Sequence, residues 1–184
     1  MKNTIITSLL IIFALGANAQ NKFITKTGYA KFFSEAPLEN IEAINNKLQS
    51  IIDMQKQDVV INVPITAFQF EKSLMQEHFN ENYLESEKFP TAEFRGYYTS
   101  KAPIDLKKSG TYDVVVKGKM TIHGVIRDLN TRGKITVKGN AIDAETVFMI
   151  KLADYDIDIP TIVFKNIAEI VAVTVKLHYL PLKS

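Results

Sequence analysis

The chain of 184 residues contains no cysteine. This absence excludes disulfide bonds, zinc sites with cysteine ligands, iron–sulfur clusters and catalytic thiols, and it also excludes lipid attachment at an N-terminal cysteine. A domain without disulfides has to be held together by packing, and a closed barrel of this size can achieve that.

An excess of charge of one sign is also lacking, since 22 Lys and Arg oppose 20 Asp and Glu. Without Lys2, the only charged residue among the first nineteen, the counts are 22 − 1 = 21 and 20, a net charge of +1. Such a balance provides no electrostatic footprint for nucleic acid or an anionic membrane. The chain has only 8 glycines, and Gly118, Gly124 and Gly133 are isolated, so no phosphate-binding loop is present.

Motifs for metal binding and catalysis are missing as well. The three histidines form no HExxH or HxH pattern, and no serine lies in a nucleophile elbow. Asp154, Asp156 and Asp158 alternate like the ligands of a calcium loop, but Ile159 occupies the position of the glycine that such a loop requires. A solvated strand edge is the favoured interpretation of these carboxylates. We therefore expect a protein that is not an enzyme and uses no cofactor or metal.

The first nineteen residues have the pattern of a signal peptide. Lys2 precedes the apolar run Ile5–Leu15, and Ala17 and Ala19 are small residues at the positions that signal peptidase reads. The run is too short to span a bilayer comfortably. We expect export to the periplasm or the medium, cleavage before Gln20, a single domain over residues 20–184 (184 − 19 = 165 residues), and no stable membrane insertion afterwards.

Most of the mature chain has strand character. In Asp58–Pro64 every second residue is apolar, and the final segment alternates in the same way from Val171 to Tyr179. Gly139-Asn140 is a strong two-residue turn sequence. The expected strands are Lys22–Thr27, Tyr29–Ser34, Lys47–Asp53, Asp58–Pro64, Ala92–Thr99, Thr111–Lys117, Thr131–Lys138, Ala141–Lys151 and the final segment. Many short strands joined by hairpin turns predict an antiparallel barrel or sandwich.

Three segments depart from this pattern. Pro37–Asn46 has mixed helix and loop character and is expected to cross between strands, and Asp154–Ile162 is expected to be a loop. Ser73–Gly96 begins with a helical spacing of apolar residues that ends by Phe89-Pro90, because a residue before proline is pushed toward extended geometry. The apolar face expected for this helical insertion comprises Leu74, Met75, His78, Phe79, Tyr83 and Leu84.

Aromatic residues are concentrated around this insertion. The chain has 11 Phe and 7 Tyr, and Phe68, Phe70, Phe79, Tyr83 and Phe89 lie close together in sequence. The interior of an eight-stranded barrel is either filled by side chains or holds one small ligand. The composition leaves a solid core and an apolar pocket equally open.

Three blocks of sequence resemble the YceI-like family of exported, lipocalin-like proteins, also called polyisoprenoid-binding. Leu74–Gly96 resembles its block of a histidine, a short helical segment and "yP-x-x-x-F-x-G/S", and Gly118–Leu129 resembles its strand–turn–strand "G-x-L-T-I-x-G-V-T-R-x-V". Phe148–Pro160 resembles "F-x-I-x-x-x-D-Y-x-I". The chain departs from the family at Gln76-Glu77, where an arginine–aspartate pair is typical, and at Ile126, where threonine is typical.

The resemblance implies an all-β fold, an extended eight-stranded antiparallel lipocalin-like barrel with a short helical cap. It also implies an elongated apolar cavity for a long isoprenoid or fatty-acyl chain, with polar groups at its mouth. Each buried CH₂ of such a chain contributes about 0.8 kcal/mol.

We therefore expect a non-catalytic carrier of a long-chain lipid or isoprenoid, with no nucleic-acid partner. The tunnel would be lined or closed by Phe68, Phe70, Met75, Phe79 and Tyr83, and His78, His123 and Arg127 are candidates for headgroup contacts. The alternatives are a solid barrel that serves as an interaction or stress-response module, and, more remotely, an enzyme that uses His78 or His123. The sequence leaves open whether the domain is a monomer or a homodimer.

Overall fold

A computed structural model describes residues 21–35, 39–159 and 167–183, which form a closed antiparallel barrel of eight strands. The order around the barrel is β1-β9-β8-β7-β6-β5-β3-β2, and β2 closes it by pairing with β1. The strands are β1 (Lys22–Ser34), β2 (Ile41–Asp53), β3 (Asp58–Pro64), β5 (Thr91–Ser100), β6 (Gly110–Ile122), β7 (Val125–Lys138), β8 (Ala141–Lys151) and β9 (Ile170–Pro181). The two-residue strand β4 (Gln69–Phe70) pairs with the edge of β2.

Alternation along each strand creates the interior, because successive side chains point to opposite faces. In β9 the five residues Val171, Val173, Val175, Leu177 and Tyr179 face inward, as predicted, and Tyr179 has no exposed surface. The inward face of β3 is formed by Val59, Ile61 and Val63. The prediction of an antiparallel barrel is confirmed.

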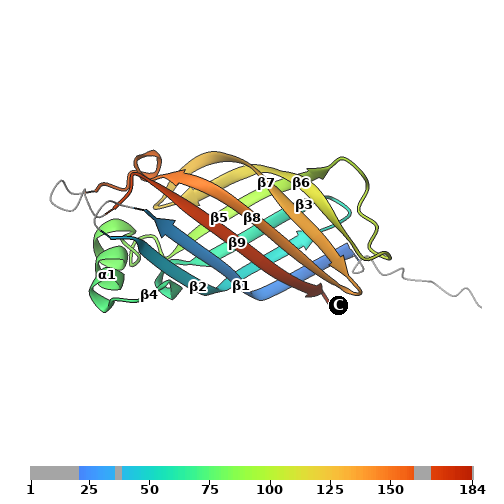
Figure 1. The fold of residues 1–184 in the computed structure, drawn as a ribbon, viewed down its shortest axis with the longest axis horizontal. Helices are drawn as coiled ribbons and strands as arrows, with labels where there is room; N and C mark the ends of the chain where they lie inside the picture. The colour runs from blue at the N-terminus through green and yellow to red at the C-terminus, as the bar shows by residue number, and fades with distance from the viewer. Residues whose placement is uncertain (1–20, 36–38, 160–166, 184) are drawn as a thin grey trace, which may run out of the picture.

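The barrel is elongated, and its two ends differ (Figure 1). One end carries the helical cap and the tight turn His123-Gly124 between β6 and β7, and we call it the cap end. The far end carries Met54–Gln57, the loop before β6, Gly139-Asn140 and the chain's C-terminus. His123 and Gly124 both have positive φ (51° and 74°), as a two-residue hairpin turn with the twist of the strands requires.

The cap is the insertion between β3 and β5. It comprises a 3₁₀ turn η2 (Ile65–Ala67), β4, helix α1 (Ser73–His78) and a π-helical turn η3 (Phe79–Tyr83), in which the Leu84 N–H donates to the Phe79 carbonyl. The predicted helical insertion, and its end before Phe89-Pro90, are thus confirmed. The predicted apolar face is wrong at Leu74, which is 58% exposed, and at His78, which is also exposed.

Several boundaries differ from the sequence prediction. Residues 41–46 are not a crossing segment but the first half of β2, which pairs with β1 up to Ser34↔Ile41. The strand period was hidden there because the fully buried inward residue is the polar Asn45. Strand β6 continues through Gly118 to Ile122.

The aspartates of the predicted Asp154–Ile162 loop do not lie on a strand edge. Asp154 belongs to the 3₁₀ turn η4 (Leu152–Tyr155), and Asp156 and Asp158 follow it in irregular chain. The end of that loop (160–162) and the predicted signal peptide (1–19) lie outside the described residues. No helix in the described ranges has the length and apolar character needed to cross a membrane.

Candidate functional site

The interior of the barrel is not completely filled by side chains. It contains a cavity of about 320 Å³ that is lined by residues from all eight barrel strands and from the cap. This volume lies at the lower end of the range of ligand pockets, roughly 300–1,000 Å³. The lining is almost entirely aliphatic and aromatic, so the cavity offers apolar contact area and few polar groups.

Toward the far end, the two tyrosine hydroxyls on the cavity wall are hydrogen-bonded to protein partners. The Ser50 hydroxyl donates to the Val60 carbonyl at 2.7 Å, and therefore accepts from the Tyr179 hydroxyl at 2.6 Å. The Tyr98 hydroxyl donates to the Met54 sulfur at 3.4 Å. Burial raises the pKa of Tyr98 to about 12, and burial also raises the pKa of Tyr179. These two hydroxyls are therefore uncharged at physiological pH.

A facing pair of glycines shapes the wall between β5 and β6. Gly96 and Gly118 are register partners, and a Cβ on either residue would come within 2.8 Å of the Phe94 ring. The missing side chains allow the Phe94 ring to lie across both strands. The cavity wall is thus flat and aromatic at this position.

Four phenylalanines close the cavity at the cap end. Phe32 of β1 stacks on Phe79 of η3, with ring centroids 5.5 Å apart and an interplanar angle of 16°. Phe68 and Phe70 contact both of these rings at centroid distances of 5.0–5.9 Å. We call these four residues the cap cluster. It joins the helical cap to the barrel through apolar contacts.

Six of the eight residues proposed from sequence lie together on the cavity wall. These are Phe68, Phe70, Met75, His78, Phe79 and Tyr83, of which His78 is mainly exposed. Burial raises the pKa of Tyr83, so its hydroxyl is a neutral donor. The structure does not bring His123 or Arg127 to the cavity lining. A role of any of these eight residues in binding remains a prediction.

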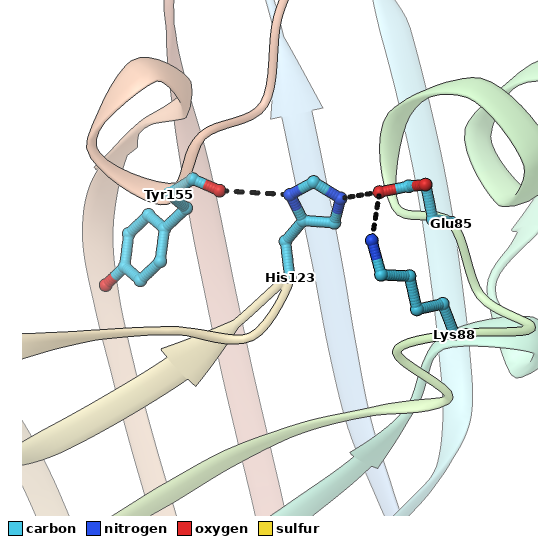
Figure 2. Close-up of polar contacts among 4 residues, drawn as sticks. All are labelled: Glu85, Lys88, His123 and Tyr155. Carbon is cyan, nitrogen blue, oxygen red and sulfur yellow. Dashed lines mark hydrogen bonds and ion pairs between the residues drawn. The ribbon is translucent and has the colours of Figure 1, made fainter.

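His123 instead connects three segments around the cap end (Figure 2). Its Nδ1 lies 3.2 Å from the Tyr155 carbonyl of η4, and its Nε2 lies 2.8 Å from Glu85 Oε2 of the cap. Lys88 approaches the same Glu85 oxygen at 3.8 Å, and the Phe89 ring packs edge-on against the imidazole. Both partners of the ring are hydrogen-bond acceptors, so the imidazole ties the cap and η4 to the β6–β7 turn.

Several lining residues were not predicted from the sequence. Phe32, Tyr98 and Tyr179 were not among the candidates, although Tyr179 had been placed on the inward face of the last strand. Thr131 and Thr146 also line the cavity, on the facing strands β7 and β8. Alternation identifies an inward residue, but it does not indicate whether that residue borders empty space or packed neighbours.

The fold and the interior define a class of protein: a closed antiparallel barrel with a capped, apolar and mostly neutral cavity. The chain belongs to the YceI-like family, because the YceI-like domain model matches residues 23–179.

Three solved structures have the same fold. A polyisoprenoid-binding domain from Saccharophagus degradans, described as implicated in plant cell wall breakdown, has a TM-score of 0.73 and 16% identity, over 88% of this chain and 99% of that one. Burkholderia cenocepacia BcnA has a TM-score of 0.63 and 14% identity, with coverages of 89% and 98%. A Campylobacter jejuni YceI protein has a TM-score of 0.63 and 13% identity, with coverages of 81% and 90%. No curated protein matched this chain in sequence.

Proposed function

We propose that this protein is an exported, non-catalytic carrier that holds one long-chain amphiphile, a polyisoprenoid or fatty-acyl lipid, in its barrel cavity. The observation that carries the proposal is the cavity itself, which has about 320 Å³ of space behind an almost wholly apolar wall. The S. degradans structure, described as a polyisoprenoid-binding domain, supports the same class of ligand. The apolar leader at the N-terminus supports a periplasmic or secreted location.

The physical chemistry of the wall favours an uncharged chain over a polar metabolite. A polar ligand would lose its hydration and, beside Tyr98 and Tyr179, find hydroxyls whose protons are already donated within the protein. An apolar chain needs no such partners. About ten buried CH₂ groups would contribute about 8 kcal/mol, equivalent to micromolar affinity before the costs of ordering.

The cavity argues against the alternative of a solid barrel that acts only through its surface. Such a barrel would be filled by side chains, and its interior would leave no room for a chain. We retain this alternative as the outcome to be expected if no amphiphile binds.

The test is to purify the mature protein from the exported fraction and examine it by native mass spectrometry, followed by organic extraction and lipid analysis. We expect a complex heavier than the mature chain (20–184), and an extract containing a chain amphiphile. The control is the same protein after delipidation, which should rebind the extracted lipid. A delipidated protein that binds neither its own extract nor isoprenols and fatty acids would refute the proposed function.

A further inference from the structure

The barrel wall is incompletely paired between β7 and β8. Their ladder runs from Lys138↔Ala141 only to Gly133↔Thr146. Beyond that point β7 continues to Val125 and β8 continues to Lys151, and in the described part of the chain these two stretches form no ladder with each other. We call this part of the wall, between residues 125–132 and 147–151, the seam.

Two threonines mark the point where the ladder stops. The Thr146 hydroxyl donates to the Arg132 carbonyl at 2.8 Å, and the Thr131 hydroxyl donates to the Val147 carbonyl at 3.2 Å. Side-chain bonds thus occupy backbone carbonyls at the place where the regular strand-to-strand bonds end. A few hydroxyl contacts separate more easily than a continuous ladder, because each contributes only about 1 kcal/mol.

The cavity extends to the same part of the wall. Its lining includes Thr131 and Thr146, and also Lys134 and Glu145, an exposed cross-strand pair beside them. Arg127 lies on the same face of β7 as the inward residues Val125 and Leu129, yet it is exposed.

The outer surface beside the seam is unusually apolar. Val147 and Met149 point outward from β8 and are each 59% exposed. Ile126 on the β7 side is 57% exposed, and Ile170, next to Lys151 on β9, is 49% exposed. These four are half of the eight large apolar residues with exposed side chains in the described ranges, and we call them the seam rim. A surface on which exposed apolar side chains are concentrated is typical of an interaction site.

The charges around the rim indicate its partner. Arg127, Arg132 and Lys151 are exposed along the two edges of the seam, and Lys134 is exposed just beyond its end. The acidic residues there are Glu145, Asp128, Asp154 and Glu169, and Asp128 is paired with Lys119 at 2.7 Å, which leaves four cations facing three further carboxylates. Cations around an apolar surface complement a bilayer that carries anionic lipid. The balanced net charge of the chain conceals this local arrangement.

We propose that the seam is the passage through which the ligand chain enters and leaves, and that the seam rim docks on an anionic bilayer during transfer. This inference rests on the proposed function. A chain that left through the side wall would otherwise cross water, and contact between the rim and the bilayer provides it with an apolar route. Strands β7 and β8 need only separate further at Thr131 and Thr146.

An engineered disulfide across the seam, which a reductant can open again, tests the passage. The chain has no cysteine of its own that could interfere. Thr131→Cys with Thr146→Cys places two thiols where the hydroxyl oxygens lie 3.4 Å apart. Thr111→Cys with Thr136→Cys is the matched control, because those hydroxyls lie 3.0 Å apart on the continuous β6–β7 ladder. The readout is transfer of cis-parinaric acid, a fluorescent fatty acid, from protein to vesicles that contain an energy-transfer acceptor.

We expect the oxidised seam variant to transfer the probe about tenfold more slowly or worse, which corresponds to about 1.4 kcal/mol in the barrier, and a reductant should restore the rate. The control pair should transfer equally fast in both redox states. If the oxidised seam variant binds the probe normally and transfers it as fast as its dithiol form does, the passage is overturned but the proposed function stays intact. Failure of the wild-type protein to bind any chain probe would overturn both.

Flotation with vesicles tests the rim. Val147→Glu with Met149→Glu should weaken binding to vesicles of phosphatidylcholine and phosphatidylglycerol by about tenfold or more, since two apolar side chains are lost from the contact. Ile51→Glu with Leu180→Glu alters two similarly exposed residues away from the seam and should have little effect. Equal losses for both pairs, or no binding by the wild type, would overturn membrane docking by the rim.

Discussion

The pair Ser50 and Tyr179 joins residues 129 positions apart across the barrel interior, and both side chains are buried. Ser50→Ala would leave the Tyr179 hydroxyl without its acceptor and remove a donor from the Val60 carbonyl, so we expect a loss of about 2 kcal/mol in the free energy of unfolding. Tyr179→Phe removes only a donor, since Ser50 still bonds to Val60, and should cost about 1 kcal/mol or less. Urea denaturation of the delipidated variants measures both. A larger loss for Tyr179→Phe would contradict the assigned direction of the hydrogen bond.

Asp143 illustrates how a surface network makes stability depend on pH. Partial burial raises its pKa, but hydrogen bonds from Lys138 at 2.8 Å and His178 at 2.6 Å outweigh burial and lower the pKa below the ordinary 3.8. A carboxyl whose pKa is lower in the folded state stabilises the fold above its unfolded pKa, and this contribution disappears as the pH falls through the folded pKa.

Asp143→Asn should therefore be less stable than the wild type at neutral pH, by about 1 kcal/mol or less because the site is partly exposed. The difference should shrink toward zero as the pH falls below the ordinary carboxyl range. Urea midpoints measured from neutral to strongly acidic pH provide the test. A gap between the two proteins that stayed constant over this range would show that the effect of the substitution does not arise from the carboxylate.

At the scale of elements, the cap depends on Phe79 more than on the helix that precedes it. Phe79 contacts the other three rings of the cap cluster, whereas Leu74 on α1 is 58% exposed. Phe79→Ala should lower the free energy of unfolding by about 2 kcal/mol and accelerate amide hydrogen exchange across residues 65–89. Leu74→Ala is the matched control and should change neither quantity. Equal effects of the two substitutions would mean that the aromatic contacts do not hold the cap.

His123 links the cap, the β6–β7 turn and η4, so its loss should loosen three elements at once. His123→Ala should increase hydrogen exchange at residues 84–89 and 152–156 while the strands of the far end keep their protection. His178→Ala removes the same type of side chain from the surface of β9 and should leave these two segments unchanged. If His123→Ala altered ligand affinity without altering exchange, the residue would act on the ligand rather than on the cap.

The sequence predicted elements whose local pattern agrees with their tertiary role. The alternation of Val171–Tyr179, the Gly139-Asn140 turn and the helical insertion were all recognisable. The first half of β2 was missed, because its inward residue Asn45 is polar and is satisfied by a bond to the Pro64 carbonyl at 2.8 Å that only the folded chain provides. The role of His123 could not be foreseen either, since Glu85 and Tyr155 lie 38 and 32 residues away.

The seam could not be predicted from the sequence either. In residues 147–150 both faces of β8 are apolar, a pattern that usually indicates a strand buried on both sides. The structure exposes one of these faces, and it does so where the ladder to β7 ends. Pairing register depends on every strand around the barrel, so it cannot be read from a single segment.

At the scale of the whole molecule, the fold leaves empty a space that a solid core would fill. Stability and binding can therefore be separated, because the closed barrel is held by its ladders and its packed ends while the ligand would occupy the middle. A substitution that fills the cavity should abolish binding without unfolding the protein. This outcome distinguishes a carrier from a barrel whose internal space is incidental.

Ala144 is suited to this test, because it lines the cavity from β8 and is only half-buried. In Ala144→Phe the new ring should occupy part of the 320 Å³ space, which leaves less room for a chain. We expect cis-parinaric acid binding to weaken by about tenfold or more, with an unfolding free energy within about 1 kcal/mol of the wild type, since the ring enters space that is empty.

Ala102→Phe adds the same ring to an exposed loop and controls for a general effect of hydrophobicity. It should bind the probe like the wild type. Fluorescence titration and urea denaturation of the delipidated proteins compare the two variants. Unchanged affinity in a folded Ala144→Phe would place the chain outside the cavity, because a ring and a bound chain cannot occupy the same part of a closed barrel of eight strands.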